Sequence, residues 1–176
     1  EDQHQFFLDH MPLSKLNKFY DSTNVFMEQI KTHVAYDEFW KSRGIIQHLK
    51  DIKPATMIVG GLFDAEDLYG PFNTYKSIEK NSDNYNTVVF GPWSHGDWAR
   101  SKDRQVVGNI YFGDSISDHF QKNIETKFFN HFLKGEADGE TNLPEAQFFN
   151  TGTKEWQSFD VWPPKNTTKE SYYMQP

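Results

Sequence analysis

Asp64 and His95 are the residues whose types and positions most plainly allow chemistry. Asp64 follows the apolar run 55–59 and a Gly-Gly pair, and His95 follows the apolar run 87–90 and a Gly-Pro pair. An aspartate that accepts a hydrogen bond from the Nδ1–H of a histidine fixes the tautomer of the ring. It also stabilises the imidazolium that forms when Nε2 takes a proton. The two residues therefore indicate proton transfer, with the histidine as the base.

Two strands joined by a helix are needed to bring this pair together. Short apolar runs that end at Gly-Gly and Gly-Pro are typical of strands buried on both faces, as in a parallel sheet. Between them, Leu68, Phe72 and Tyr75 have helical spacing, which predicts a helix over residues 65–80. Strand, helix and strand form a right-handed βαβ unit, whose two strand-end loops lie at the same edge of the sheet. We therefore expect the acid and the base to meet there.

The nucleophile that such a pair would serve is missing from the sequence. In α/β-hydrolases the triad runs Ser, then Asp or Glu, then His, and the acid and the base here have that order. No G-x-S-x-G motif occurs. Residues 113–117 (GDSIS) lack the final Gly, and Ser94 stands directly beside His95, too close along the chain for a nucleophile elbow. We expect the serine in a segment before residue 1.

Spacing alone leaves a purely structural interpretation open. Asp64 could be the N-cap of the helix over residues 65–80, with Glu66 and Asp67 as first-turn acids that the helix dipole favours. His95 could be a loop histidine without a function. Asp97 and Arg100 are interpreted as surface loop residues.

The remaining segments predict helices followed by a β hairpin. The first 34 residues indicate two or three short helices, and Asp37 is a candidate N-cap for a helix over residues 37–49. Apolar residues recur every four positions in a long helix over residues 115–133, which Gly135 closes. Residues 146–159 alternate around a TGTK turn, as in a hairpin. A domain boundary is predicted between residues 135 and 143.

Composition excludes several classes of protein. Aromatic residues make up 16% of the 176 residues, which is typical of a globular chain. The net charge of −7, with no run of Lys or Arg, argues against binding to nucleic acid. The absence of cysteine excludes disulfides, a thiolate nucleophile and a Cys-based metal site. No apolar stretch approaches the about 18 residues of a membrane span.

Longer motifs give a family resemblance. The segments GGLFDAEDLYGPFNTYKSIEK (60–80) and NTVVFGPWSHGDWAR (86–100) resemble the superfamily of α-amino acid ester hydrolases, cocaine esterase and X-Pro dipeptidyl-peptidases. They look closest to the α-amino acid ester hydrolases and to glutaryl-cephalosporin acylase-like proteins of Bacteroides type. The flanking segments 35–55 and 145–164 are also similar, so the resemblance spans most of residues 33–164.

The resemblance implies an α/β fold in three parts. Residues 1–34 would be the end of a helical cap. Residues 35–138 would be the C-terminal part of an α/β-hydrolase domain (a βαβ unit plus helices), and residues 139–176 would start a jelly-roll β domain. The sequence starts without Met or a signal segment and ends inside an expected strand. We therefore expect a C-terminal fragment of a longer protein.

The resemblance also assigns roles to residues. Carried over by position, Asp64 is the triad acid and His95 the triad base. Glu66 and Asp67 match two acids that help to hold the α-ammonium group of a substrate. Separately, Trp93 and Tyr69, together with Trp98, could line an acyl pocket, although aromatic residues beside a loop more often serve packing.

The expected function is therefore acyl transfer to water by a serine hydrolase that lacks its serine in this chain. The substrates would be esters, amides or short peptides with α-amino acyl, β-lactam side-chain or X-Pro groups. We expect no cofactor and no metal, and the isolated chain is expected to be inactive. Its partners would be the N-terminal half of the same enzyme or a second copy. The resemblance favours a periplasmic or secreted bacterial protein, with the cytoplasm as the alternative.

Two other functional classes compete with this one. A metal-dependent hydrolase could use His95 and the carboxylates of Asp64, Glu66 and Asp67. However, no H-E-x-x-H motif or second nearby histidine occurs. A non-catalytic module could bind carbohydrate through Trp156 or Trp162, or could bind a partner domain.

Overall fold

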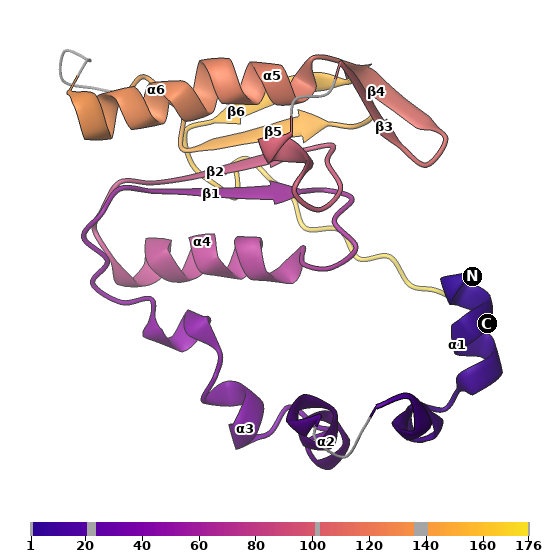
Figure 1. Ribbon diagram of the computed structural model, residues 1–176. Coiled ribbons are helices and arrows are strands. Elements are labelled where there is room, and N and C mark those ends of the chain that lie inside the picture. The colour runs from indigo at the N-terminus through magenta and orange to yellow at the C-terminus, as the bar shows by residue number, and fades with distance from the viewer. Residues whose placement is uncertain (1, 21–23, 101–102, 136–140, 176) are drawn as a thin grey trace. The chain divides into compact units, whose positions relative to one another are not determined.

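The computed structural model describes residues 2–20, 24–100, 103–135 and 141–175. The chain divides into two compact units, Glu1–Ile45 and Ile46–Pro176. The second unit carries the sheet and both loops of the expected site (Figure 1).

The first unit is built of short helices. These are α1 (Gln3–His10), the 3₁₀ turn η1 (Leu13–Phe19), α2 (Val25–Thr32) and α3 (Glu38–Lys41). The prediction of short helices in the first 34 residues is thus confirmed. Asp37 caps α3 as expected, because its side chain accepts a hydrogen bond from the backbone N–H of Phe39 at 3.0 Å. The longer helix expected over residues 37–49 is wrong: α3 ends at Lys41, and a separate 3₁₀ turn, η2 (Ile45–His48), follows Gly44.

The second unit begins with the predicted βαβ motif. Strand β1 (Thr56–Gly61) leads through α4 (Tyr69–Asn81) to β2 (Asn86–Gly91), and the two strands pair in parallel from Thr56 opposite Asn86 to Gly61 opposite Gly91. Every residue of β2 is buried. The shared register brings the last residues of both strands to the same edge of the sheet.

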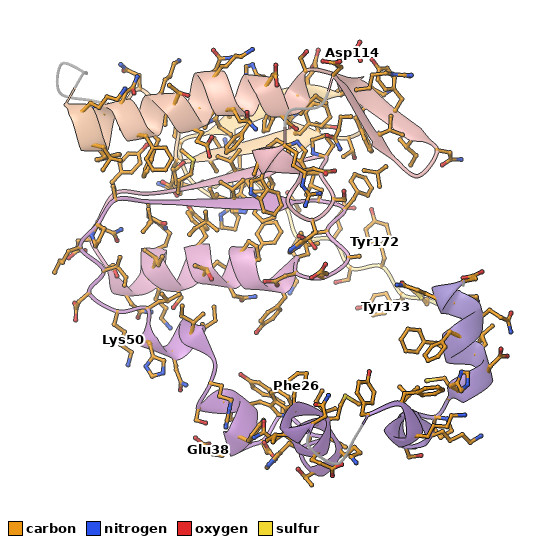
Figure 2. All side chains as sticks on the ribbon, viewed as in Figure 1. Phe26, Glu38, Lys50, Asp114, Tyr172 and Tyr173 are labelled. Atoms are coloured by element: carbon orange, nitrogen blue, oxygen red, sulfur yellow. The ribbon has the colours of Figure 1, made fainter. Side chains whose placement is uncertain are left out.

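The sheet is covered on both faces. Val88 and Phe90 of β2 pack with Tyr75 of α4, whereas Val89 packs with residues of the long helix that follows. Successive side chains of a strand point to opposite faces, so β2 contributes to both cores. Figure 1 shows α4 below the sheet and the α5–α6 run above it, and Figure 2 shows the side chains that fill both layers.

The long helix is a continuous run of four segments. These are α5 (Ile116–Phe120), η4 (Gln121–Glu125), α6 (Thr126–Phe129) and η5 (Asn130–Lys134), of which η4 and η5 are wound as π turns. An α-helix has about 3.6 residues per turn, so a stripe of period four drifts around it. The wider π turns compensate for that drift. As a result, Ile116, Phe120, Ile124 and Phe128 are all buried, and Gly135 ends the run at φ +66° as expected.

The hairpin β5 (Ala146–Asn150) and β6 (Glu155–Phe159) forms as predicted. It does not, however, stand apart from the sheet that β1 and β2 form. Strand β5 pairs in parallel with β2, which gives the order β1-β2-β5-β6, and residues on both sides of the expected boundary at 139 belong to one compact unit. Residues 146–159 thus continue the sheet of β1 and β2, and the start of a jelly-roll domain at residue 139 stays a prediction. Strand β2 is buried throughout and needs a partner at each edge, and β5 is that second partner.

A second, two-stranded sheet lies between β2 and the long helix in the sequence. Strands β3 (Arg104–Val107) and β4 (Ile110–Asp114) are antiparallel, with an irregularity between Gln105 and Val106. Gln105 is buried, and it faces the loop that carries the candidate base.

Candidate active site

The loops after β1 and β2 are joined along their backbones. Leu62 N–H donates to Gly91 O at 2.9 Å, and Phe63 N–H donates to Trp93 O at 3.0 Å. Gly61 allows this approach, since a Cβ there would lie 2.3 Å from the Trp93 carbonyl oxygen. The two loops, which carry Asp64 and His95, are therefore joined by backbone hydrogen bonds.

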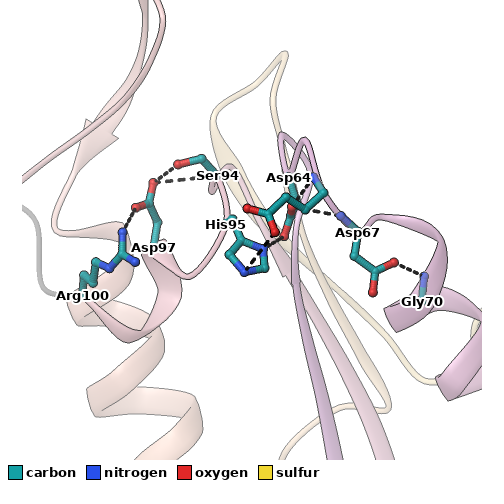
Figure 3. Close-up of polar contacts among 8 residues, drawn as sticks. Asp64, Asp67, Gly70, Ser94, His95, Asp97 and Arg100 are labelled. Atoms are coloured by element: carbon teal, nitrogen blue, oxygen red, sulfur yellow. Dashed lines mark hydrogen bonds and ion pairs between the residues drawn. The ribbon is translucent and has the colours of Figure 1, made fainter. Parts of the chain in front are cut away.

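Asp64 and His95 form a hydrogen-bonded pair. Asp64 Oδ2 lies 2.9 Å from His95 Nδ1 (Figure 3). The Asp64 side chain is 2% exposed, whereas that of His95 is 54% exposed. The expectation that the acid and the base meet is thus confirmed. With Nδ1 held by the buried carboxylate, Nε2 is left as the ring nitrogen available for proton transfer.

The second carboxylate oxygen of Asp64 holds its own loop. Oδ1 accepts hydrogen bonds from the backbone N–H of Glu66 at 2.8 Å and of Asp67 at 3.1 Å. The alternative interpretation of Asp64 as the N-cap of a helix from residue 65 is wrong in detail, because α4 begins at Tyr69. Asp64 caps the turn before the helix with one oxygen and orients His95 with the other.

These contacts set the protonation of the pair. Burial by itself raises the pKa of Asp64, but the two backbone N–H donors and His95 outweigh it, so the pKa is lowered from 3.8. The hydrogen bond to Asp64, its negative charge and that of Glu66 raise the pKa of His95 above 6.5, against smaller opposing effects of burial and Arg100. Asp64 is therefore ionised at neutral pH, and His95 is a stronger base than a free histidine.

The two neighbouring acids have different surroundings. Glu66 is exposed, and its Oε2 lies 3.9 Å from His95 Nε2, on the reactive side of the ring. Asp67 Oδ1 instead accepts a hydrogen bond from Gly70 N–H at 2.5 Å in the first turn of α4. A side chain at residue 70 would overlap the Asp67 carboxylate, because a Cβ there would lie 2.1 Å from Oδ2. Glu66 is thus free to face a ligand, while Asp67 also stabilises the start of α4.

The expected aromatic wall is not formed as predicted. Trp93 is fully buried in the core, and its Nε1–H donates to Ser117 Oγ at 3.0 Å. With no exposed surface it has a packing role, and its assignment as a substrate-binding residue does not fit the structure. Tyr69 is 77% exposed at the start of α4. Trp98 is half-buried, and its ring centroid lies 6.2 Å from that of His95.

Asp97 is the residue whose surroundings the sequence interpretation missed. It was expected on the surface, but it is 1% exposed, and Ser94 Oγ donates to its Oδ2 at 2.5 Å. This bond engages the hydroxyl of Ser94 away from His95 (Figure 3). Arg100 is exposed as expected. The spacing of Ser94 and Asp97 could have indicated this contact, because hydroxyl and carboxylate side chains three residues apart often bond within a turn.

The described residues contain neither a metal-site cluster nor a membrane-spanning helix. Among the described residues, no three His, Asp or Glu side chains are grouped as a metal site requires. No helix in the described part of the chain has the length and apolar character of a membrane span.

A family comparison agrees with this geometry. The family model of the X-Pro dipeptidyl-peptidases (S15 family) matches residues 2–97, which is more than half of the chain and includes both members of the pair. The chain belongs to the X-Pro dipeptidyl-peptidase (S15) family. The resemblance inferred from the motifs is therefore confirmed.

The relatives and structural neighbours are longer proteins than this chain. Proteins of Mycobacterium bovis and Mycobacterium tuberculosis, both named as candidate serine esterases, are 32% identical over 88 residues. That match spans 49% of this chain and 13% of each relative. The chain thus corresponds to a small part of the curated relatives that it matches.

Solved structures match most of the chain. An aminopeptidase from a marine-sediment Thaumarchaeota archaeon has a TM-score of 0.80 at 26% identity, and it covers 94% of this chain and 27% of its own. An α-amino acid ester hydrolase has a TM-score of 0.81 at 24% identity, over 92% of this chain and 27% of its own. A CocE/NonD family hydrolase from Staphylococcus aureus has a TM-score of 0.54 at 17% identity, over 86% and 24%. These matches confirm the α/β-hydrolase type of fold.

Proposed function

We propose that this S15 chain supplies the acid and the base of a serine hydrolase that transfers acyl groups to water. The observation that carries the proposal is the pair of Asp64 Oδ2 and His95 Nδ1 at 2.9 Å, with the acid buried and the base exposed. The pair lies at the carboxyl edge of a parallel sheet, where α/β folds gather their functional groups. The relatives and neighbours are named as esterases, an ester hydrolase and an aminopeptidase, and these names support the same class of reaction.

The proposed nucleophile is a serine outside these 176 residues, in the N-terminal half of the same enzyme. Its Oγ attacks the carbonyl carbon of an ester or amide, and His95 Nε2 takes its proton. The resulting imidazolium is stabilised by the ionised Asp64 and then gives the proton to the leaving group. Water then attacks the acyl group on the serine, with His95 again as the base, and the free serine is restored.

We propose substrates with a free α-amino group, which is an ammonium at neutral pH. Glu66 supports this because its exposed carboxylate lies beside the reactive nitrogen of His95. A cation bound there would lie next to the carbonyl that the serine attacks. Asp67 adds negative charge nearby, although its Oδ1 is engaged at the start of α4.

The central test replaces the base in the full-length protein. His95→Ala should lower kcat for ester hydrolysis by about 10³-fold or more, because the proton of the serine then has no acceptor. The matched control is His48→Ala, which removes an exposed histidine of η2 and should leave turnover unchanged. Ester turnover near wild type in His95→Ala would refute the proposal.

The preference for α-amino substrates has a separate test. Glu66→Gln should raise KM for an α-amino ester while leaving the matching des-amino ester unaffected. Asp67→Asn keeps an acceptor for Gly70 N–H, so it isolates the effect of the charge. An equal loss on both esters in Glu66→Gln would remove the amine-binding role and leave the hydrolase proposal standing.

A further inference from the structure

Asp97 is a buried carboxylate two residues after the proposed base. Three donors converge on its Oδ2: Ser94 Oγ at 2.5 Å, Ser94 N–H at 3.3 Å and Gln105 Nε2 at 3.5 Å. Its Oδ1 faces Arg100 Nη1 at 3.8 Å. A carboxylate is buried in a protein at a large desolvation cost unless such partners compensate. This network therefore holds a specific conformation of the loop.

The backbone around Asp97 is anchored as well. Its N–H donates to Ser94 O at 3.1 Å, and its carbonyl accepts from Ser117 Oγ at 3.1 Å. Ser117 Oγ also accepts the Trp93 Nε1–H bond, so the same α5 hydroxyl holds the loop on both sides of His95. Figure 3 shows Ser94, Asp97 and Arg100 as one cluster beside His95.

His95 depends on this anchoring for its position. Its ring is more than half exposed, so close packing does not fix it. The next residue, Gly96, has φ +76°, a left-handed conformation that glycine adopts without a steric cost. The ring is therefore held by its bond to Asp64, and the backbone between Ser94 and Asp97 brings it within reach of that bond.

We propose that Asp97 is a positioning residue that holds the His95 loop so that Nδ1 meets Asp64 and Nε2 faces the nucleophile. This role rests on the hydrolase function proposed above. We assign this role to the hydrogen bonds that Oδ2 accepts from Ser94 and Gln105, and not to the ion pair of Oδ1 with Arg100.

The structure offers a variant that separates geometry from charge. In Asp97→Asn the amide oxygen can take the place of Oδ2 and keep all three donors, while Nδ2 turns toward Arg100. The Arg100 side chain is 67% exposed and can move away. Asp97→Ala removes the acceptor altogether. Asp83→Ala, in the exposed turn between α4 and β2, is the surface control.

Kinetics and NMR of His95 in the full-length protein give the readouts. Asp97→Ala should lower kcat for ester hydrolysis about 10- to 100-fold, as a displaced catalytic group does, with KM little changed. In the same variant the neutral ring should lose its fixed Nδ1–H tautomer, and the pKa of His95 should fall toward 6.5. Asp97→Asn and Asp83→Ala should keep the wild-type kcat, tautomer and pKa.

Several outcomes overturn the positioning role. One is a folded Asp97→Ala variant with wild-type kcat and a wild-type His95 tautomer. Another is equal impairment in Asp97→Asn and Asp97→Ala, which would assign the effect to charge. If Asp97→Ala does not fold, Ser94→Ala removes only the bond from Ser94 Oγ to Asp97. This variant should also lower kcat and loosen the Nδ1–H tautomer of His95. A wild-type kcat and tautomer in Ser94→Ala would refute the role. Failure of the hydrolase proposal would show instead as activity in His95→Ala, and the tautomer readout would still decide the role of Asp97.

Discussion

Replacing Asp64 by asparagine tests the proposed mechanism at its most specific point. In the wild type, Asp64 Oδ2 accepts the Nδ1–H of His95, and Oδ1 accepts two backbone N–H bonds at 2.8 and 3.1 Å. An asparagine has one acceptor oxygen for these two positions. If the oxygen keeps the two backbone bonds, Nδ2 takes the place of Oδ2 and points a donor at the ring. His95 must then carry its proton on Nε2, where it cannot accept one from a serine.

The size of the effect follows from this competition. Turning the amide around would give His95 its acceptor but would break two backbone hydrogen bonds, at about 1 kcal/mol each. A difference of about 2 kcal/mol leaves the productive orientation roughly 30-fold less populated. Loss of the negative charge that stabilises the imidazolium lowers the rate further. We therefore expect kcat to fall by about 10³- to 10⁴-fold, near the roughly 10⁴-fold loss known for the corresponding change in a serine-protease triad.

The assay is the pH dependence of ester hydrolysis by the full-length protein, compared among wild type, Asp64→Asn and Asp64→Ala. The acidic limb of the wild-type profile, where activity falls as His95 becomes protonated, should lie above pH 6.5 because Asp64 raises the pKa of His95, and it should move to lower pH in both variants. Asp64→Ala should also lose about 1 kcal/mol of stability toward urea, because it leaves the turn uncapped, whereas Asp64→Asn should not. A kcat for Asp64→Asn within about tenfold of wild type would refute the tautomer argument.

Three further predictions concern stability and packing. The Asp64–His95 pair should stabilise the fold most between pH 3.8 and 6.5. The contribution of His95 is lost as the pH rises through its raised pKa. The contribution of Asp64 is lost as the pH falls through its lowered pKa. The difference in Tm between wild type and His95→Ala should accordingly narrow on both sides of that window, and a constant difference would contradict it. Tyr75→Phe removes a buried hydroxyl that donates to a carboxylate, and it should lower the free energy of unfolding by about 1 to 3 kcal/mol in urea titrations, whereas Tyr69→Phe on the surface should change it little. Gly61→Ala would place a Cβ 2.3 Å from the backbone of the histidine loop, so it should lower both Tm and ester turnover, and unchanged values would show that the two loops can separate.

Local patterns predicted much of the second unit. The apolar runs before Gly60 and Gly91 predicted the two parallel strands, of which β2 is buried throughout and β1 only at its last two residues. The alternation of residues 146–159 gave the hairpin, and the period-four stripe gave the long helix. The proximity of Asp64 and His95 followed from the βαβ order, since consecutive parallel strands end at the same edge.

Other features could not be predicted, because they depend on residues far apart in the sequence. The pairing of β5 with β2 joins segments more than fifty residues apart, and the hairpin pattern does not state its partner. The burial of Trp93 and Asp97 depends on the return of α5 and β3 over the histidine loop. Read along the chain, Asp97 is an acid in a polar loop; in the fold it is a buried acceptor for three donors.

The sequence by itself predicted the Asp64–His95 pair, the strands that carry it and the family, because these depend on residue types at short spacing. The tertiary structure decided how they are held. It directed one Asp64 oxygen to His95 and the other to the turn after Asp64. It also left Glu66 exposed beside His95, whereas Asp67 accepts a hydrogen bond from Gly70. It also buried Asp97 with Gln105 as a donor, because burial and hydrogen-bond partners are set only when distant segments pack together.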